Sequence, residues 1–542
     1  MNASVLIVGA GPSGLSLALA LLQNGVSVRV IDKASTYHIG QKGAGIQPRI
    51  LELQKFLGVL PDIQKNGGFA PPMIHYLPGG ETKTVEVIAH MENTPDRPCI
   101  NPIVIGQDVH EEILRGHLAK YGVEVELGTE LVSFEQFHDR VVSCVLKTRD
   151  GKRFEESIES QWIIGADGAH GIVRKTLGLT FLGETREGDH FVVGDICIKK
   201  PLLDRDLWHL WGEAATKSVT LRSFETRDTD KYNIFCMGRD LDAEKMGSGR
   251  EEFIRAFYEI TGRTDIEFGD VIWLSNFQPN VRMVNSYGSG RAFLAGDSAH
   301  VHSPTGGQGL NSGIQDAVNL AWKLALVQKG LAPRDLLESY SRERIPVIAA
   351  MLNKTSEILI KTFSDGGIGQ TLAGWNRGYE LRQFGVNYRT SPIVIDETPV
   401  EGDEAVDPYR SGNDDTIRGG DRAPDAPGLI FVNDPTHKTS LFEIFGTSYH
   451  TVLVFSGDYA AVLDTLKSYP AGIIKSVVIL PQKLTGVISA DYVLVDGDGY
   501  AYKHYNMAEK LTKIVLVRPD GIIGGLVCSV DGLKQYFRGI LV

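Results

Sequence analysis

Cysteine is scarce in this chain of 542 residues, and its distribution excludes two kinds of site. The five cysteines form no C-x-x-C pair and lie at Cys99, Cys144, Cys197, Cys236 and Cys528. An odd, scattered set is typical of a reducing compartment and excludes both a disulfide framework and a zinc site built on cysteine pairs. His300 and His302 lie close together, but no third ligand accompanies them at metal-binding spacing, so we expect no metal.

The chain also lacks an excess of positive charge and any long apolar run. A formal net charge of -12 argues against nucleic acid or an anionic membrane surface as a partner. No uninterrupted apolar stretch reaches the length of a membrane span. The apolar segment 4–31 imitates a signal peptide, but no Lys or Arg precedes it and glycines interrupt it, so we expect a cytoplasmic protein.

Glycine is abundant instead, and near the start of the chain it connects a strand to a helix. The apolar run Ser4–Val8 leads into Gly9-Ala10-Gly11-Pro12-Ser13-Gly14, a helix-forming stretch and a second strand that ends at Asp32. Gly9 permits a tight turn, Gly11 lets a pyrophosphate approach the backbone, and Gly14 lets helix and strand pack closely. Asp32 is placed to accept a hydrogen bond from a ribose hydroxyl, so the pattern predicts dinucleotide binding.

A second strand–turn–helix pattern follows some 280 residues later. The strand 291–295 runs into Gly296-Asp297-Ser298-Ala299-His300 and, through the turn 304–311, into an apolar helix over 312–328. A helix N-terminus directs backbone N–H groups at a negatively charged ligand. A nicotinamide dehydrogenase has no use for a second such site, whereas FAD is long enough to reach one. The two motifs together therefore favour FAD over NAD.

A third motif lies between them, where the strand Trp162–Gly165 ends in a turn that carries Asp167-Gly168 and is followed by Arg174. Together the three stretches resemble the three fingerprints of the single-component FAD-dependent aromatic hydroxylases, the para-hydroxybenzoate and phenol hydroxylase family. The resemblance is dense over residues 4–350 and looser beyond them. One departure is Lys42, which stands where relatives often carry arginine.

The resemblance implies an α/β fold with a Rossmann-like FAD-binding domain, an antiparallel-sheet substrate domain and a C-terminal thioredoxin-like domain. We place the FAD-binding domain at 1–180, with excursions into the substrate domain, and at 281–362. The substrate domain is placed at 181–280, a helical or linker region at 363–418, and the thioredoxin-like domain, without redox cysteines and with a structural or dimerising role, at 419–542. Period-two alternation predicts five antiparallel strands at Val192–Ile198, Leu207–Trp211, Val219–Glu225, Tyr232–Met237 and Val271–Phe277.

Site residues follow from the motifs and the resemblance. The expected FAD-binding residues are Gly9, Gly11, Pro12, Ser13, Gly14, Asp32, Lys33, Gln107, Asp167, Gly296, Asp297, Gly307, Gly309, Leu310 and Asn311. Near the reacting end of the cofactor we expect Pro304, Gly306 and Arg49, with Arg49, Asp167 and Arg174 also contributing to nicotinamide binding. Alternation in the sheet makes candidate substrate-pocket residues of His209, Trp211, Arg222, Phe224, Phe235 and Met237.

The implied reaction is hydroxylation of an aromatic, phenolic or polyketide substrate. Reduced FAD and O2 form a flavin C4a-hydroperoxide that delivers one oxygen atom, while NADPH or NADH supplies the electrons. Two alternatives stay open: epoxidation or oxidative dearomatisation of a larger metabolite by the same fold, and a flavin-binding scaffold without turnover. The W-x-W-x-I-P signature of flavin halogenases is absent, which counts against that branch.

Overall fold

The structure is a computed structural model that describes residues 3–149, 151–185, 189–199, 202–225, 230–303, 306–363, 378–398, 406–410, 416–455, 458–482, 488–507 and 513–542. Its centre is a six-stranded sheet in the order β19-β20-β11-β1-β2-β7. These strands are Gly288–Ser289, Ala292–Leu294, Trp162–Gly165, Val5–Val8, Val28–Ile31 and Val125–Glu126. All but β19 run parallel, so the three predicted motifs meet at one edge, where β1, β11 and β20 end.

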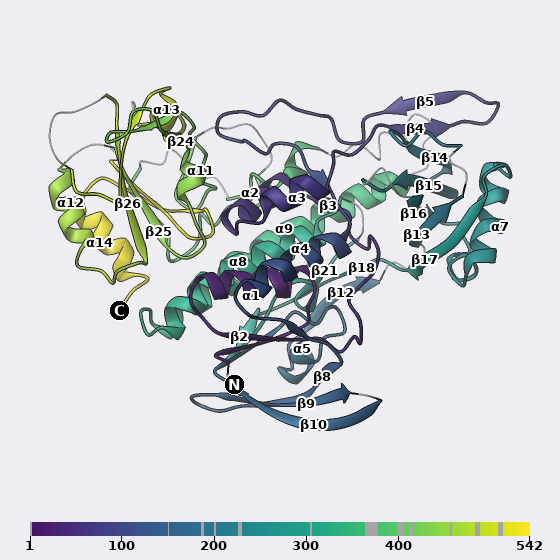
Figure 1. The fold of residues 1–542 in the computed structure, drawn as a ribbon, viewed down its shortest axis with the longest axis horizontal. Coiled ribbons are helices and arrows are strands. Elements are labelled where there is room, and N and C mark those ends of the chain that lie inside the picture. Colours follow the sequence, from purple (N-terminus) through teal and green to yellow (C-terminus); the bar gives the residue numbers. More distant parts are fainter. Residues whose placement is uncertain are drawn as a thin grey trace.

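Long helices cover this sheet. Helix α1 (Pro12–Gln23) begins with a proline at its first position, and α8 (Gly309–Gln328) is buried along most of its length. The residues of α8 from Asn311 to Leu326 are all buried, and this helix runs through the middle of the molecule in Figure 1. The neighbouring helices are α2 (Pro48–Phe56), α3 (Leu60–Asn66), α4 (Gln107–Ala119), α5 (Ile172–Thr176) and α9 (Glu338–Phe363).

The predicted antiparallel strands form a seven-stranded sheet in the order β17-β13-β16-β15-β14-β4-β5. Its strands are Phe268–Phe277, His190–Ile198, Lys231–Gly238, Lys217–Ser223, Trp208–Glu213, Met73–Tyr76 and Thr82–Val85. The last two come from the N-terminal part of the chain, and β4 pairs parallel with β14. Helices α6 (Ala243–Met246) and α7 (Arg250–Thr261) pack against one face, on the right of Figure 1.

Three small sheets complete this part of the molecule. The outlying hairpin sheet β10-β9-β8 is made of Lys152–Ser160, Val141–Arg149 and Thr129–Gln136. The sheet β12-β18-β21, made of Phe181–Thr185, Asn280–Val284 and His300–Val301, joins the start and end of the predicted substrate region to the second motif. The pair β3-β6 is formed by Gly45–Ile46 and Ile103–Val104.

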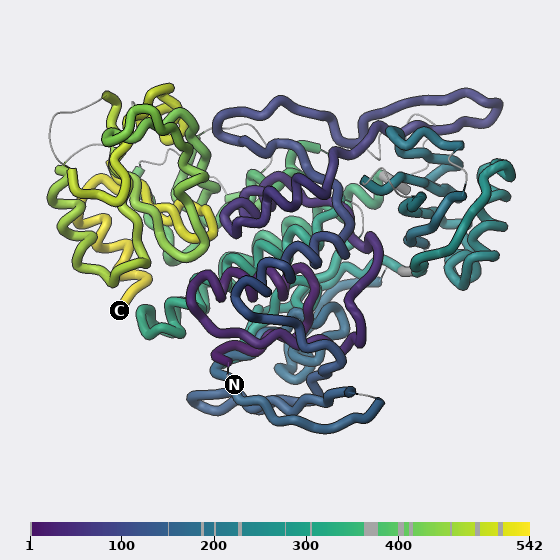
Figure 2. Tube along the Cα trace, in the orientation of Figure 1, coloured from purple at the N-terminus to yellow at the C-terminus, as the bar shows by residue number. Residues whose placement is uncertain are grey.

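The C-terminal unit is built on an eight-stranded mixed sheet in the order β22-β29-β28-β25-β26-β27-β23-β24. Its strands are Ile395–Asp396, Ile523–Val527, Ile514–Val517, His450–Val454, Ile474–Leu480, Tyr492–Asp496, Leu429–Phe431 and Lys438–Thr439, and its helices are α11 (Leu441–Ile444), α12 (Tyr459–Leu466), α13 (Tyr500–His504) and α14 (Val530–Arg538). The stretches Thr451–Phe455, Ser476–Leu480 and Lys513–Arg518, which are rich in apolar and β-branched residues, coincide within two residues with β25, β26 and β28. Figure 2 shows this unit beside α2. Phe56 of α2 packs edge-on against Phe442 of α11.

No helix in the described ranges is long and apolar enough to cross a membrane.

Candidate functional site

The glycines before α1 have different surroundings. Gly9 has φ +106, and a Cβ on it would lie 2.2 Å from the carbonyl oxygen of Ala166; a Cβ on Gly14 would lie 2.1 Å from the carbonyl oxygen of Gly9. Both glycines are therefore required by the packing of the turn. Gly11 has an ordinary φ of −75, and nothing lies within 4 Å of a Cβ placed there. The fold does not require glycine at Gly11, and open space adjoins the start of α1.

Asp32 holds the glycine turn from the end of β2. Its Oδ2 accepts a hydrogen bond from the backbone N–H of Ala10 at 2.9 Å, and its Oδ1 accepts one from the N–H of Ala34 at 2.8 Å. Each carboxylate oxygen has a second lone pair, so these contacts leave acceptor capacity for a ligand. The next residue, Lys33, is exposed.

The beginnings of α1 and α8 touch through small residues. A Cβ on Gly313 would lie 2.2 Å from Oγ of Ser13, and a Cβ on Gly296, whose φ is +64, would lie 2.4 Å from the same atom. The structure thus brings the first and second motifs into direct contact, although about 280 residues separate them. Two helix N-termini, both favourable to anions, lie side by side.

The first turn of α8 presents three backbone N–H groups. The N–H groups of Gly309, Leu310 and Asn311, which we call the α8 head, find no acceptor among the described residues. His302 lies behind them, because a Cβ on Gly309 would be 2.6 Å from its Nε2. Burial lowers the pKa of His302 to about 4, so the imidazole is neutral near pH 7.

Side-chain hydrogen bonds fix the α8 head against the 45–47 strand. Asn311 is fully buried; its Nδ2 donates to the carbonyls of Gly45 (2.9 Å) and Gly307 (2.6 Å), and its Oδ1 accepts from the N–H of Gln47 at 2.7 Å. The carbonyl of Gly306 accepts from Nε2 of Gln308 at 2.8 Å. Gly306 and Gly307 both have positive φ, as a tight turn requires. Pro304 lies outside the described residues.

Asp297 is the exposed carboxylate of the second motif. Its neighbours Gly296 and Ser298 are buried, yet its own side chain is open to solvent and accepts no hydrogen bond from the described residues. Desolvation by the surrounding protein raises its pKa, and Asp316 adds to the rise, whereas His300 opposes it. A solvent-accessible acid with a raised pKa and no partner among the described residues is a favourable acceptor for hydroxyl donors.

Asp167 supports the start of α5, whereas Arg174 supports the second motif. Oδ2 of Asp167 accepts from the N–H of Val173 (3.2 Å), while its buried Oδ1 has no hydrogen-bond partner among the described residues. Burial raises the pKa of Asp167. Arg174 donates to the carbonyls of Ser298 (2.8 Å) and Ala169 (2.6 Å), and its guanidinium lies over the ring of Phe181.

Gln107 approaches the α8 head from α4. Its Nε2 donates to Oε1 of Glu111 at 2.8 Å. A Cβ on Gly43 would lie 3.3 Å from Oε1 of Gln107 and 3.8 Å from Cδ1 of Leu310. The structure therefore brings Gln107 and Leu310 together at the glycine-rich loop that precedes β3.

The six candidate pocket residues do not all lie on one face of the seven-stranded sheet. His209 and Trp211 lie on the face that α7 covers: Trp211 packs on Phe257 at 5.6 Å between ring centroids, and His209 bonds the hydroxyl of Tyr76 at 2.8 Å. Burial lowers the pKa of His209. These two side chains are core residues, and the structure does not bring them to the motifs.

Arg222, Phe235 and Met237 lie on the opposite face, as the strand register requires. Met237 and Phe235 pack with Phe191 and with Leu359 of α9. Phe224 follows the end of β15 and pairs by its backbone with Lys231. Alternation predicted which residues share a face, but not which face α7 covers.

Arg49 is placed elsewhere. Its buried guanidinium binds Glu52 at 2.8 Å and the carbonyl of Asp520 in the C-terminal unit at 2.7 Å. The structure does not bring Arg49 to the α8 head, although Gln47, two residues earlier, does reach it.

A buried ionic group beneath α8 was missed by sequence reasoning. Asp316 accepts from Nε of Arg344 at 2.6 Å, from Nε2 of His300 at 2.8 Å and from the N–H of Gly296 at 3.0 Å. The cationic Arg344 holds the pKa of Asp316 below its usual range despite burial. This group anchors the second motif to α8 and α9. The signal in the sequence was a pair of charged residues, Asp316 and Lys323, inside a helix predicted to be apolar.

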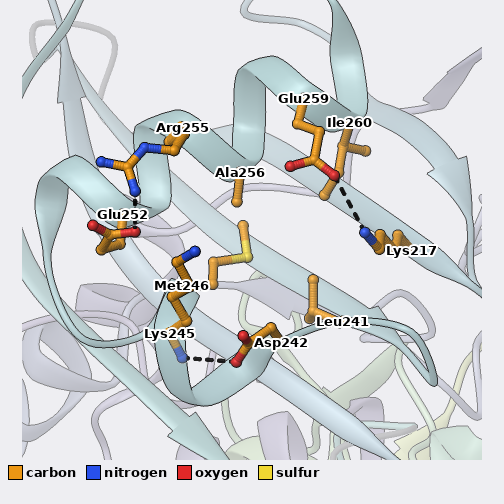
Figure 3. Close-up of a pocket in the computed structure, with 10 residues that line it drawn as sticks. All are labelled: Lys217, Leu241, Asp242, Lys245, Met246, Glu252, Arg255, Ala256, Glu259 and Ile260. Carbon is orange, nitrogen blue, oxygen red and sulfur yellow. Dashed lines mark hydrogen bonds and ion pairs between the residues drawn. The ribbon is translucent and has the colours of Figure 1, made fainter.

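Among the described residues, no group of three or more His, Cys, Asp or Glu side chains gathers in a way that could hold a metal ion. A hollow shown in Figure 3 lies between α6, α7 and β15, on the far face of the seven-stranded sheet, and Lys217 and Glu259 pair across it. None of the three motifs contributes to that hollow.

Comparison with known proteins agrees with this geometry. Residues 2–355 match the family described as FAD binding domain. The chain is 31% identical to a flavin-dependent monooxygenase of Mycobacteroides abscessus, over 99% of this chain and all of that one, and 30% identical to pentachlorophenol 4-monooxygenase of Sphingobium chlorophenolicum, over 96% and 93%. The fold superposes with a TM-score of 0.78 on aklavinone-11 hydroxylase in complex with FAD and aklavinone, at 24% identity and 99% coverage of both chains. The chain therefore belongs to the family of FAD-dependent monooxygenases.

Proposed function

We propose that this enzyme hydroxylates an aromatic or phenolic substrate with O2 and NADPH or NADH, and that its FAD extends from the start of α1 to the α8 head. The observation that carries the proposal is the close approach of these two helix starts through Ser13, Gly296 and Gly313. Open space at Gly11, an exposed Asp297 without a described partner and three N–H groups without described acceptors lie on these starts. This donor set suits a dinucleotide with an anionic pyrophosphate, a polyol chain and a ring that gains negative charge on reduction.

Each residue then has a task. The N–H groups at the start of α1 hold the pyrophosphate, Asp32 accepts from the ribose, and Asp297 accepts from the ribityl hydroxyls. Gln107 contacts the ribityl chain as well. The α8 head faces the ring and stabilises negative charge there by a helix-terminus effect of about 0.3–2 kcal/mol.

Bound FAD supplies the redox chemistry, in which one atom of O2 is transferred to the substrate. The protein must orient the substrate and exclude water, because water in the site favours release of hydrogen peroxide instead of product. Neutral His302 and the buried Asn311 keep the α8 head free of competing charge. The turn with Pro304 and Gly306 is proposed to border the reacting end.

The substrate is proposed to lie against the face of the seven-stranded sheet that carries Phe235 and Met237. This face offers aromatic and thioether contacts, and Glu225 already neutralises Arg222. Such a wall suits a neutral aromatic ring or a polycyclic phenol. Relatives named for pentachlorophenol and for 6-methylpretetramide support this range of substrates.

We further propose that residues 1–180 and 281–362 form a Rossmann-like FAD-binding domain, 181–280 the substrate domain, and 419–542 a thioredoxin-like domain. The parallel β20-β11-β1-β2-β7 arrangement and the mixed C-terminal sheet support these assignments. The C-terminal unit has no C-x-x-C pair, which excludes disulfide exchange, and we propose a structural or dimerising role for it.

The test is to purify the protein, record its visible spectrum, and follow NADPH and NADH oxidation against a panel of phenols and polycyclic aromatics. We expect a two-band flavin spectrum and a product heavier by one oxygen atom that carries label from 18O2. Mass spectrometry and NMR of the product separate hydroxylation from epoxidation or dearomatisation. A protein that takes up no FAD, or whose NAD(P)H oxidation no aromatic compound stimulates, would contradict the proposal.

A further inference from the structure

Residues 40–43, which we call the 40–43 loop, connect the seven-stranded sheet to the α8 head. On one side the N–H of Gly40 donates to Oδ2 of Asp108 in the first turn of α4, at 2.9 Å. At its far end, Gly43 adjoins Gln107 and Leu310. The loop thus borders the α8 head directly, and its position affects the space in front of that head.

The sheet holds this loop through Gln41, whose side chain is 2% exposed. The N–H of Gln41 donates to Oδ2 of Asp195 on β13 at 2.7 Å. Its Oε1 accepts from Arg222 on β15 at 2.6 Å, and its Nε2 donates to Glu225 at 3.1 Å. Gln41 is therefore bound by residues of the seven-stranded sheet and of the segment just after β15 through its backbone N–H, its side-chain oxygen and its side-chain nitrogen.

The partners of Gln41 are themselves fixed. Asp195 is fully buried and also accepts from Asn233 at 2.9 Å and from the indole N–H of Trp273. Arg222 is 4% exposed and forms an ion pair with Glu225. Gly40 has φ +93, and a Cβ on it would lie 1.8 Å from Nε1 of Trp273, so only glycine permits this close approach. Asp195, Arg222 and Glu225 are thus held in place by their own contacts and together form a binding site for Gln41.

We propose that Asp195, Arg222 and Glu225 are positioning residues that act through Gln41. They hold the 40–43 loop against the α8 head, and so keep the substrate sheet and the flavin at one spacing that excludes water. The consequence for turnover rests on the proposed function, whereas the contact itself does not. Arg222 is then a structural cation of this contact and is not the anchor of an anionic substrate.

The experiment compares wild-type protein with Gln41→Met, which keeps the side-chain length but removes both polar atoms, and with Gln41→Ala. Lys217→Ala is the matched control, because Lys217 lies on the same strand as Arg222 and pairs with Glu259 on the opposite face at 3.3 Å (Figure 3). Hydrogen–deuterium exchange is measured on peptides covering residues 38–46, without and with FAD. A peroxide assay then measures the share of NAD(P)H electrons that reach hydrogen peroxide.

In both Gln41 variants we expect amide exchange at 38–46 to be about tenfold faster, and to rise more there than elsewhere in the chain, as the local loss of two hydrogen bonds predicts. The peroxide share should rise, while Lys217→Ala behaves as wild type in both assays. Unchanged exchange at 38–46 in the Gln41 variants, or an equal change in Lys217→Ala, would overturn the proposal. The exchange comparison without FAD does not depend on turnover, so failure of the proposed function is recognised separately.

Discussion

Gly11 separates the demands of the ligand from the demands of the fold. Because its φ is ordinary and a Cβ meets nothing within 4 Å, Gly11→Ala should leave the melting temperature of the apoprotein unchanged. The added methyl group would occupy the space that the pyrophosphate needs, so FAD affinity should fall by about tenfold or more. Flavin fluorescence titration measures the affinity. Gly116→Ala, which also adds a Cβ in open space on α4, is the control, and equal FAD affinity in the two variants would contradict this role for Gly11.

Asp425 makes the stability of the fold depend on pH, and its contribution decreases as the pH rises. The side chain is 4% exposed, its Oδ1 accepts from the N–H groups of Ala426 and Phe442, and burial raises its pKa to about 6. Between the unfolded pKa of 3.8 and about 6, the folded state holds the extra proton, so this stabilising contribution is present at low pH and is lost as the pH rises through 6.

Asp425→Asn keeps the acceptor oxygen and removes the charge. It should therefore raise the free energy of unfolding at pH 8 by about 2–3 kcal/mol and make little difference at pH 4. Melting temperatures of both proteins at the two pH values measure this. If the variant melts below wild type at pH 8, the two N–H groups need the ionised carboxylate and the argument fails.

Among the elements, the contact of α1 with α8 does most to shape the site. Three small residues, Ser13, Gly296 and Gly313, let the two helix starts approach each other. Gly313→Ala places a Cβ 2.2 Å from Oγ of Ser13 and 3.1 Å from Cα of Gly296. Overpacking of this kind costs about 1–3 kcal/mol, and it should also weaken FAD binding because it separates the two anion sites.

A double-mutant cycle tests this contact. Ser13→Ala removes the hydroxyl that the new methyl group strikes, so adding it to Gly313→Ala should restore part of the lost stability. Chemical unfolding of the two single variants and the double variant supplies the coupling free energy. Additive effects of the two substitutions would show that Ser13 does not limit the approach of α8.

The glycine motifs and the strand alternation could be predicted from the sequence because they are local. Glycine at Gly9 and Gly296 permits a positive φ, glycine at Gly14 permits a close approach to the turn, and the five predicted strands appear in the sheet. The contacts of Gln41 and Arg49 could not be predicted, since their partners lie about 150 to 470 residues away. Which face of the seven-stranded sheet is covered could not be predicted either, because this depends on where α7 packs. Alternation shows only which residues share a face.

In the whole molecule, one turn of the C-terminal unit holds the helices of the flavin-binding part. Arg518 binds both oxygens of Glu343 on α9 at 2.7 and 2.9 Å and also pairs with Asp520. Asp520 reaches Asn319 of α8 at 3.2 Å through its side chain and Arg49 of α2 at 2.7 Å through its carbonyl. The helices α2 and α8, which meet at Asn311 and Gln47, are therefore tied to the same turn.

Arg518→Met should cost about 3–5 kcal/mol, because it leaves Glu343 and Asp520 buried with one cation fewer. Lys467→Ala, which breaks an exposed pair with Asp464 in the same unit, should cost at most about 1 kcal/mol. Thermal and chemical unfolding of both variants provides the comparison. An effect of Arg518→Met no larger than that of Lys467→Ala would mean that the contacts of Arg518 do not stabilise the protein, which would contradict this account.

The central claim is that the starts of α1 and α8 share one FAD, and titration of the apoprotein with FAD tests it most directly. Wild-type protein should bind one FAD per chain. Asp297→Ala should bind it at least about tenfold more weakly, because charged hydrogen bonds of about 1.5–3 kcal/mol each are lost. Asp139→Ala, at an exposed acid far along the outlying hairpin, should match wild type. An Asp297→Ala protein that purifies with full flavin and binds FAD as tightly as wild type would contradict the account.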